Sequence, residues 1–304
     1  MNEFDGVLPV LKPAGMTSHD VVAKCRRLLQ MRRIGHTGTL DPSVTGVLPL
    51  CLGRATRMVE YLQEMPKEYR AVLKLGISTD TEDLTGTVIE EMPKVDVTEA
   101  QVREALQDFI GPIMQTPPMY SAVKVDGKRL YELAREGKTV ERKAREVVIH
   151  EIELTAFEGG DQPEVSLRVL CSKGTYIRTL CVDLGAKLGI PSTMAKLERT
   201  LSAGIGLEGC LTFEQIAEHM EAGTLQEALI RADKAAVHMP EHTVDERRLD
   251  NALKGQKLAS WAVLPSPEGM QGQFRLYAPD DRFIGIYRWD EEAGRVVPVK
   301  VFLP

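Results

Sequence analysis

At residues 35–46 the chain reads Gly35-His36-Thr37-Gly38-Thr39-Leu40-Asp41-Pro42-Ser43-Val44-Thr45-Gly46. Glycine or proline occupies four of these twelve positions, and both residue types interrupt helices and regular strands. The apolar run Val47-Leu48-Pro49-Leu50-Cys51-Leu52 follows directly. The pattern therefore predicts a shaped loop that the apolar run anchors on the core.

Asp41 is the residue of this loop that is best suited to chemistry. Pro42 biases Asp41 away from helical dihedral angles, so we expect the carboxylate to extend from a loop and not from a helix face. A fixed carboxylate beside a histidine and threonine hydroxyls suits a nucleophile or a general base. The alternative is an Asx-type turn capped by Asp41, because aspartate and proline are common in turns.

Composition indicates a globular protein of two domains. The chain has 304 residues, of which 43% are hydrophobic, and a typical domain has roughly 100–200 residues. The five cysteines are widely spaced without a Cys-x-x-Cys pair, so neither a disulfide framework nor a zinc cluster is indicated. We expect no metal and no cofactor. The sequence shows no signal peptide and no run near the roughly 18 apolar residues of a membrane span, so we expect a cytoplasmic protein.

Charge is distributed unevenly along the chain. The net charge of −6 argues against a nucleic-acid partner when it is averaged over all residues. Two stretches differ from that average, and their basic residues are Lys12, Lys24, Arg26, Arg27, Arg32, Arg33, Lys124, Lys128, Arg129, Arg135, Lys138, Arg142, Lys143 and Arg145. Such asymmetry is typical of a polyanion site on an acidic protein, although basic runs also form solvated helix faces.

Hydrophobic periodicity predicts a mixed α/β domain followed by a small β domain. A helix is expected after an N-cap at Ser18, and another after a capping box formed by Thr98 and Gln101. Strands are expected at 67–76, 147–157 and 165–171. The last part of the chain predicts a helix and then a small antiparallel barrel, with elements at 244–253, 257–264, 273–278, 283–288 and 296–302.

Arg178 follows the second of the long strands. The sequence around it predicts a helix that begins after Gly174, with Arg178 in its first turn. A cation there is unfavourable against the helix dipole, which indicates a nearby carboxylate. The alternative is an exposed surface arginine.

Five ordered motifs resemble those of the bacterial tRNA pseudouridine synthase B (TruB) family. The motifs are Lys12-Pro13-x-Gly15-x-Thr17-Ser18, Gly35-His36-Thr37-Gly38-Thr39-Leu40-Asp41-Pro42, Thr79-Asp80-Thr81-x-Asp83-x-x-Gly86, Pro117-Pro118-Met119-Tyr120-Ser121-Ala122-x-Lys124 and Gly174-Thr175-Tyr176-Ile177-Arg178. The resemblance implies an α+β catalytic domain in residues 1–237, with a large, mostly antiparallel sheet, flanking helices and an RNA-binding flap at about 117–146. Residues 238–304 would form a small β-barrel-like PUA domain.

The same resemblance implies roles for individual residues. Asp41 would be the catalytic aspartate, Tyr69 would pack on the flipped uracil, and Arg178 would pair with the Asp41 carboxylate. His36 would enter the T loop in place of the extruded base. The pocket would also be lined by Lys12, Tyr176 and Leu197.

The implied activity is the isomerisation of uridine to pseudouridine at position 55, in the T loop of tRNA. The base must leave its stack to reach the carboxylate, and breaking and rejoining the glycosidic bond needs no redox step or metal. The sequence leaves open whether Asp41 attacks the sugar or the base. The implied partner is the tRNA T stem-loop, and we expect a monomer without a protein partner.

Two rival functions use the same residues. A non-catalytic tRNA-binding or folding protein would flip the base without isomerising it. A metabolic hydrolase with Asp41 as its nucleophile would leave both basic stretches without a purpose.

Overall fold

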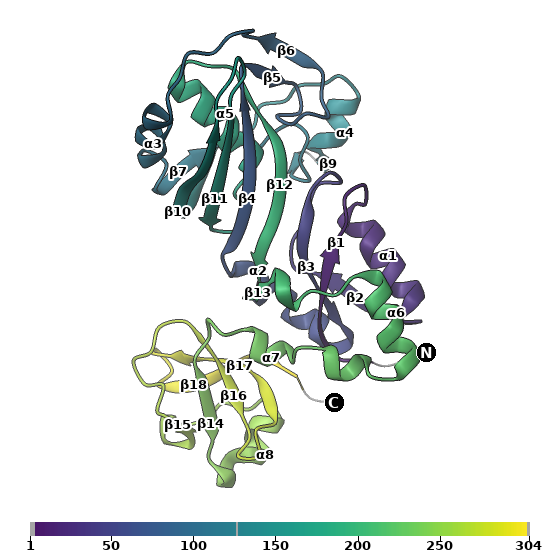
Figure 1. Ribbon diagram of the computed structural model, residues 1–304. Coiled ribbons are helices and arrows are strands. Elements are labelled where there is room, and N and C mark those ends of the chain that lie inside the picture. Colours follow the sequence, from purple (N-terminus) through teal and green to yellow (C-terminus); the bar gives the residue numbers. More distant parts are fainter. Residues whose placement is uncertain (1–3, 126, 303–304) are drawn as a thin grey trace.

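A computed structural model describes residues 4–125 and 127–302 of the chain, and its elements form two lobes (Figure 1). The larger lobe contains the strands β1 (Gly6–Lys12), β2 (Ile34–His36), β3 (Thr45–Leu52), β4 (Lys67–Leu75), β5 (Ile77–Thr79), β6 (Val88–Glu91), β7 (Gly111–Gln115), β8 (Lys124–Val125), β9 (Lys128–Arg129), β10 (Arg145–Glu158), β11 (Glu164–Cys171), β12 (Ser192–Ser202) and β13 (Ile205–Gly206). Its helices are α1 (Ser18–Leu28), α2 (Val59–Glu64), α3 (Glu99–Gln107), α4 (Leu130–Arg135), α5 (Ile177–Leu188) and α6 (Phe213–Ala222). The rest comprises α7 (Ala232–Ala235), β14 (Glu241–Val244), α8 (Leu249–Leu253), β15 (Val263–Leu264), β16 (Gln273–Tyr277), β17 (Phe283–Asp290) and β18 (Arg295–Val301).

The main sheet runs in the order β1-β3-β12-β4-β11-β10-β7, with β2 on β3 and β13 on β12. Its pairs are antiparallel except that of β12 with β3. β4 alternates between buried and less buried residues, so that Tyr69, Ala71 and Leu73 face one core. This confirms the predicted α+β fold with a mostly antiparallel sheet.

Helix ends follow local sequence signals with one difference. Thr98 and Gln101 form the predicted capping box of α3. The N-cap of α1 is Thr17, and not Ser18 as predicted, because Asp20 completes a reciprocal box with Thr17. The Ser18 hydroxyl instead accepts a hydrogen bond from the backbone N–H of Leu40 at 2.9 Å, and it thereby ties α1 to the loop that carries Asp41.

The C-terminal lobe is a curled sheet in the order β15-β14-β16-β17-β18, consistent with a PUA-like half-barrel. Two predictions are only partly met in this lobe. The helix predicted at 244–253 is present as a 3-10 turn at Glu246–Arg248 and α8 at Leu249–Leu253, whereas Val244 ends β14 and pairs with Val263 of β15. The preceding residues of β14 pair in parallel with β16. In the predicted strand 257–264 only β15 pairs with β14, since the segment before it contains Ala259, Ser260 and Ala262, which have low strand propensity.

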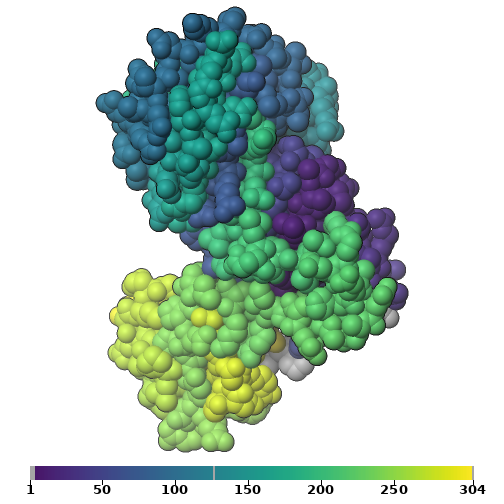
Figure 2. Space-filling view, in the orientation of Figure 1, coloured from purple at the N-terminus to yellow at the C-terminus, as the bar shows by residue number. Residues whose placement is uncertain are grey.

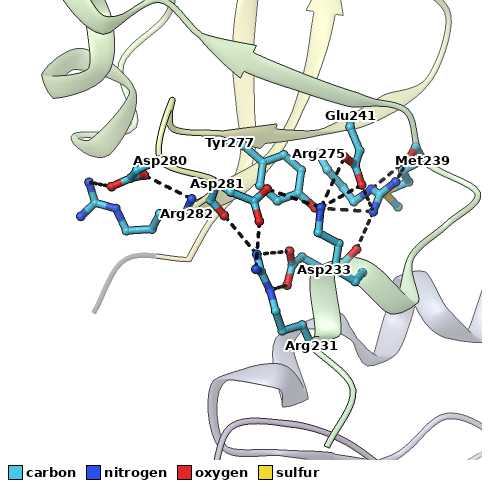
Figure 3. Close-up of polar contacts among 10 residues, drawn as sticks. Arg231, Asp233, Met239, Glu241, Arg275, Tyr277, Asp280, Asp281 and Arg282 are labelled. Atoms are coloured by element: carbon cyan, nitrogen blue, oxygen red, sulfur yellow. Dashed lines mark hydrogen bonds and ion pairs between the residues drawn. The ribbon is translucent and has the colours of Figure 1, made fainter.

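Apolar and ionic contacts join the two lobes. Met58 and Tyr61 of the larger lobe pack in one core with Met239 and Ile286. Around α7, Arg231 Nη2 lies 2.8 Å from Asp233 Oδ2, and its Nη1 lies 3.1 Å from Asp281 Oδ2 (Figure 3). Figure 2 shows the green residues near 200–235 between the purple N-terminal segment and the C-terminal lobe. Along residues 4–125 and 127–302, no helix is long and apolar enough to cross a membrane.

Candidate active site

A cavity of about 420 Å³ opens where the loop before β3 meets β4, β12 and the start of α5. The loop between β7 and β8 completes its wall. The lining residues are 37–41, Val44, Gln63, Lys67, Tyr69, 121–123, 172–178, Leu197 and Arg199. Of the residues predicted for the site, the structure therefore brings Asp41, Tyr69, Tyr176, Arg178 and Leu197 to one cavity.

Asp41 and Arg178 form an ion pair in this cavity. Arg178 Nη2 lies 2.9 Å from Asp41 Oδ2, and only 5% of the arginine side chain is exposed. Arg178 stands in the first turn of α5, where the carboxylate offsets the unfavourable helix dipole. The guanidinium also donates to the carbonyl oxygens of Thr81 and Tyr120, both at 2.8 Å. Three separate segments of the chain therefore meet at Arg178.

The environment of Asp41 acts on its pKa in opposite directions. Burial raises the pKa of Asp41 above its usual range, and the nearby Asp83 adds to that rise. The Arg178 charge and, more weakly, Lys12 oppose it. Burial outweighs Arg178, so the carboxylate is a stronger base than a solvated aspartate, which suits a nucleophile or general base.

Tyr69 and Leu197 come from neighbouring strands of the sheet floor. Tyr69 on β4 is 9% exposed and lines the cavity. Leu197 pairs with Ala71, two residues along β4 from Tyr69. Burial raises the pKa of Tyr69, which keeps the phenol neutral. The cavity therefore offers both an uncharged aromatic ring and an ionisable carboxylate.

Tyr176 is fixed where the chain enters α5. Its backbone N–H donates to Gln115 Oε1 at 3.0 Å, and its carbonyl accepts from Gln115 Nε2 at 3.2 Å. Gln115 is buried on β7, the edge strand of the main sheet. Burial also raises the pKa of Tyr176, so this ring is a second neutral group on the wall.

Lys12 is not among the residues that line the cavity. It pairs with Gly46 across β1 and β3, which places it behind the loop with none of its surface exposed. Its ammonium donates to the carbonyls of Pro13, Pro42 and Val44, the last at 2.6 Å. Burial lowers the pKa of Lys12 to about 8. Lys12 therefore supports the loop and does not line the pocket.

His36 also lies outside the cavity. It is the last residue of β2, and its Nδ1 accepts a hydrogen bond from the Gly38 backbone at 3.3 Å. The His19 ring lies 6.1 Å away in an edge-on arrangement. Burial lowers the pKa of His36, so the ring is neutral near pH 7. Its role in RNA binding stays a prediction.

Lys67 and Arg199 line the cavity although the sequence prediction gave them no role. Lys67 donates to the carbonyls of Gln63 and Met65, and burial lowers the pKa of Lys67 to about 8. The sequence signal for Arg199 is its spacing: it falls two residues after Leu197 on a strand and shares its face. A charged residue at an inward position indicates a special environment.

The flap and α1 present basic side chains outside the cavity. On the flap, Tyr131 lies near Arg129 and Arg135, whose guanidinium carbons are 5.8 and 5.5 Å from the ring centre. In Figure 1, α4 and β9 lie beside the loops at the upper ends of β1 and β3. Asp126, within the flap, falls outside the described residues.

The basic residues at and just after the end of α1 form no ion pairs with other described residues. They are Arg26, Arg27, Arg32 and Arg33, and all are exposed. Arg26 and Arg33 only donate to uncharged acceptors, the Ile34 carbonyl and the Thr56 hydroxyl. These four arginines, which we term the α1 basic patch, are therefore available to an anionic partner. Among the described residues, no three His, Cys, Asp or Glu side chains are grouped to hold a metal.

Comparison with known proteins covers almost the whole chain. Residues 26–177 match the protein-family model described as TruB family pseudouridylate synthase (N terminal domain). Residues 178–254 match the family model described as tRNA pseudouridylate synthase B C-terminal domain. Residues 240–302 match the model described as Pseudouridine synthase II TruB, C-terminal.

Curated relatives and solved structures agree with these models. A Bacillus pumilus protein called tRNA pseudouridine synthase B is 45% identical over 295 residues, covering 93% of each chain. The Bacillus licheniformis protein of the same name is 46% identical over 299 residues, covering 97% of this chain and 92% of its own. A chain in a Cbf5-Nop10-Gar1 complex superposes with a TM-score of 0.77 and 28% identity, over 98% of this chain and 85% of that chain.

Proposed function

Because the chain belongs to the TruB family of tRNA pseudouridine synthases and so isomerises uridine in tRNA, we propose that its target is the uridine at position 55 of the T loop. The observation that carries the proposal is the Asp41–Arg178 ion pair, which lines the same cavity of about 420 Å³ as Tyr69. A flipped uridine needs such a site: a carboxylate for the glycosidic carbon or the base, and a flat apolar face for the ring.

In the proposed reaction, the bond between ribose C1′ and uracil N1 breaks and its electron pair stays on the uracil. The Asp41 carboxylate holds the intermediate covalently, through the sugar or through the base. The uracil then turns against the ring face of Tyr69 and the side chain of Leu197, and these apolar surfaces make no hydrogen bonds that would fix its orientation. A bond forms between C1′ and C5, the C5 proton leaves, and N1 gains a proton.

We propose that the T stem-loop is gripped by the flap and the α1 basic patch. Tyr131 with two arginines near its ring suits binding of an unpaired base, and the α1 basic patch suits the phosphates. His36, beside the loop of Asp41, would fill the space that the base leaves. We assign residues 1–237 to catalysis and residues 238–304 to a PUA-like module, in a monomer that works with tRNA in the cytoplasm.

Tritium release tests the proposed position. Transcribed tRNA that carries tritium at uridine C5 loses it when C5 bonds to C1′. We expect release from tRNA with uridine at position 55 and none when cytidine replaces that one nucleotide. Release that persists with cytidine would reject position 55, and tRNA binding without any release would favour the non-catalytic rival.

A further inference from the structure

Arg199 stands between the two groups to which the proposed reaction assigns chemistry. On β12 it pairs with Gly46 of β3 on one side and with Tyr69 of β4 on the other. Gly46 is the second residue of β3, which directly follows the loop that carries Asp41. A single strand position therefore adjoins both the catalytic loop and the tyrosine.

The side chain of Arg199 bonds to both sides of the same loop. Its Nε donates to the Val47 carbonyl at 2.8 Å, and its Nη2 donates to the Gly38 carbonyl at 3.3 Å. Gly38 and Val47 lie on either side of Asp41 along the chain. Arg199 also lies directly opposite Tyr69 in the register of β12 and β4, and its positive charge acts on the phenol. One planar group thus holds both ends of the loop beside the tyrosine.

Arg199 forms no ion pair with any carboxylate of the described residues, whereas Arg178 pairs with Asp41. The side chain of Arg199 is 1% exposed. Burying an unpaired charge is unfavourable, and an apolar residue would fill the same space at lower cost. The field of this charge opposes the rise in the pKa of Tyr69 and contributes to the lowered pKa of Lys67. The presence of this buried charge therefore indicates that Arg199 has a function beside the reacting groups.

We propose that Arg199 is a positioning residue for the isomerisation: by holding the loop of Asp41 beside the Tyr69 side chain, it fixes the carboxylate relative to the face on which uracil turns. The inference rests on the proposed roles of Asp41 and Tyr69. Lysine keeps the charge at this position but cannot donate from a planar fork to several acceptors at once.

Arg199→Lys, Tyr69→Phe and the double variant test this inference, with Arg168→Lys as the matched control. Arg168 lies on β11, on the other side of β4 from β12, and pairs with Glu68, Glu151 and Glu153, none of which lines the cavity. The single-turnover rate of tritium release, the Kd for tRNA and the melting temperature are measured for each variant.

We expect Arg199→Lys to slow single turnover on the order of 10²-fold, as small misplacements of reacting groups do, while the Kd and the rate of the control stay near wild type. In the Tyr69→Phe background the same substitution should cost much less, because the hydroxyl on which Arg199 acts is already absent. A wild-type rate in Arg199→Lys, or losses that multiply in the double variant, would overturn the inference alone. A wild-type rate in Tyr69→Phe would show that the hydroxyl is not needed and would overturn the inference, while the role of the Tyr69 ring as a stacking face would stand.

Discussion

Arg178 Nη2 lies 2.9 Å from Asp41 Oδ2, and the same nitrogen donates to the Tyr120 carbonyl at the base of the flap. The carboxylate that we assign to the reaction and the segment that we assign to RNA binding therefore share one buried guanidinium. This arrangement makes the geometry of Asp41 depend on a residue that need not touch the substrate.

Arg178→Lys should slow turnover much more than it weakens tRNA binding. Lysine keeps the charge but cannot reach the carboxylate, Thr81 and Tyr120 together. We expect kcat to fall on the order of 10²-fold, as when one preorganised donor is removed. Steady-state kinetics on unmodified tRNA measure this effect, with Arg168→Lys as the control. An unchanged kcat in Arg178→Lys would contradict the role of the ion pair.

Neutralising the α1 basic patch should reduce the salt dependence of tRNA binding. If Arg26, Arg27, Arg32 and Arg33 contact phosphates, each change to glutamine should lower the slope of log K against log salt by roughly 1. Arg103→Gln is the control, since Arg103 is already paired with Glu99 on α3. Equal slopes for the patch variants and the control would show that these arginines form a solvated helix face and do not contact phosphates.

Gly46→Ala should destabilise the fold strongly. A Cβ at Gly46 would lie 2.1 Å from the Arg199 carbonyl oxygen, and its φ is +109°. Gly223 also has a positive φ of +70°, but a Cβ there meets nothing within 4 Å. We expect Gly223→Ala to lower the free energy of unfolding by about 1–2 kcal/mol, and Gly46→Ala by at least about 3 kcal/mol. Similar losses in urea unfolding would show that β3 and β12 do not approach so closely.

Lys67 should make stability depend on alkaline pH. Burial lowers the pKa of Lys67 to about 8, so the folded state binds fewer protons than the unfolded state between that value and the usual 10.5. Below about pH 8 the buried charge of Lys67 therefore lowers the free energy of unfolding. As the pH rises from about 8 to 10.5 the folded protein loses this charge first, and the free energy of unfolding increases. Relative to Lys67→Met, wild-type protein should gain on the order of 1–3 kcal/mol between pH 7.5 and 10. A constant difference between the two unfolding curves would contradict the lowered pKa.

Features that depend on local sequence were predictable. Thr98 and Gln101 form the expected capping box of α3, and the alternation of β4 shows in its burial. Arg178 in the first turn of a helix indicated a carboxylate partner, and Asp41 occupies that place. In each case the signal lies within a few residues of the feature it specifies, or in an electrostatic conflict that only a nearby group can relieve.

Features that depend on strand pairing were not predictable from one sequence. Lys12 lies behind the loop because β1 pairs with β3 in a register that sets it against Gly46. Arg199 reaches the site because β12 lies between β3 and β4. Residues 241–244 form a strand because β16 is available beside them. Register between distant strands is set by tertiary packing, and no local pattern of these residues encodes it.

The most direct test of the account is single turnover by Asp41→Asn on tRNA labelled with tritium at uridine C5. Asparagine keeps the size of the side chain and removes the nucleophile, and Asp96→Asn changes an exposed aspartate far along the chain as a control. We predict no tritium release by Asp41→Asn, with tRNA binding retained, and wild-type release by Asp96→Asn. Release by Asp41→Asn at a rate near wild type would contradict the assignment of Asp41 and the mechanism built on it.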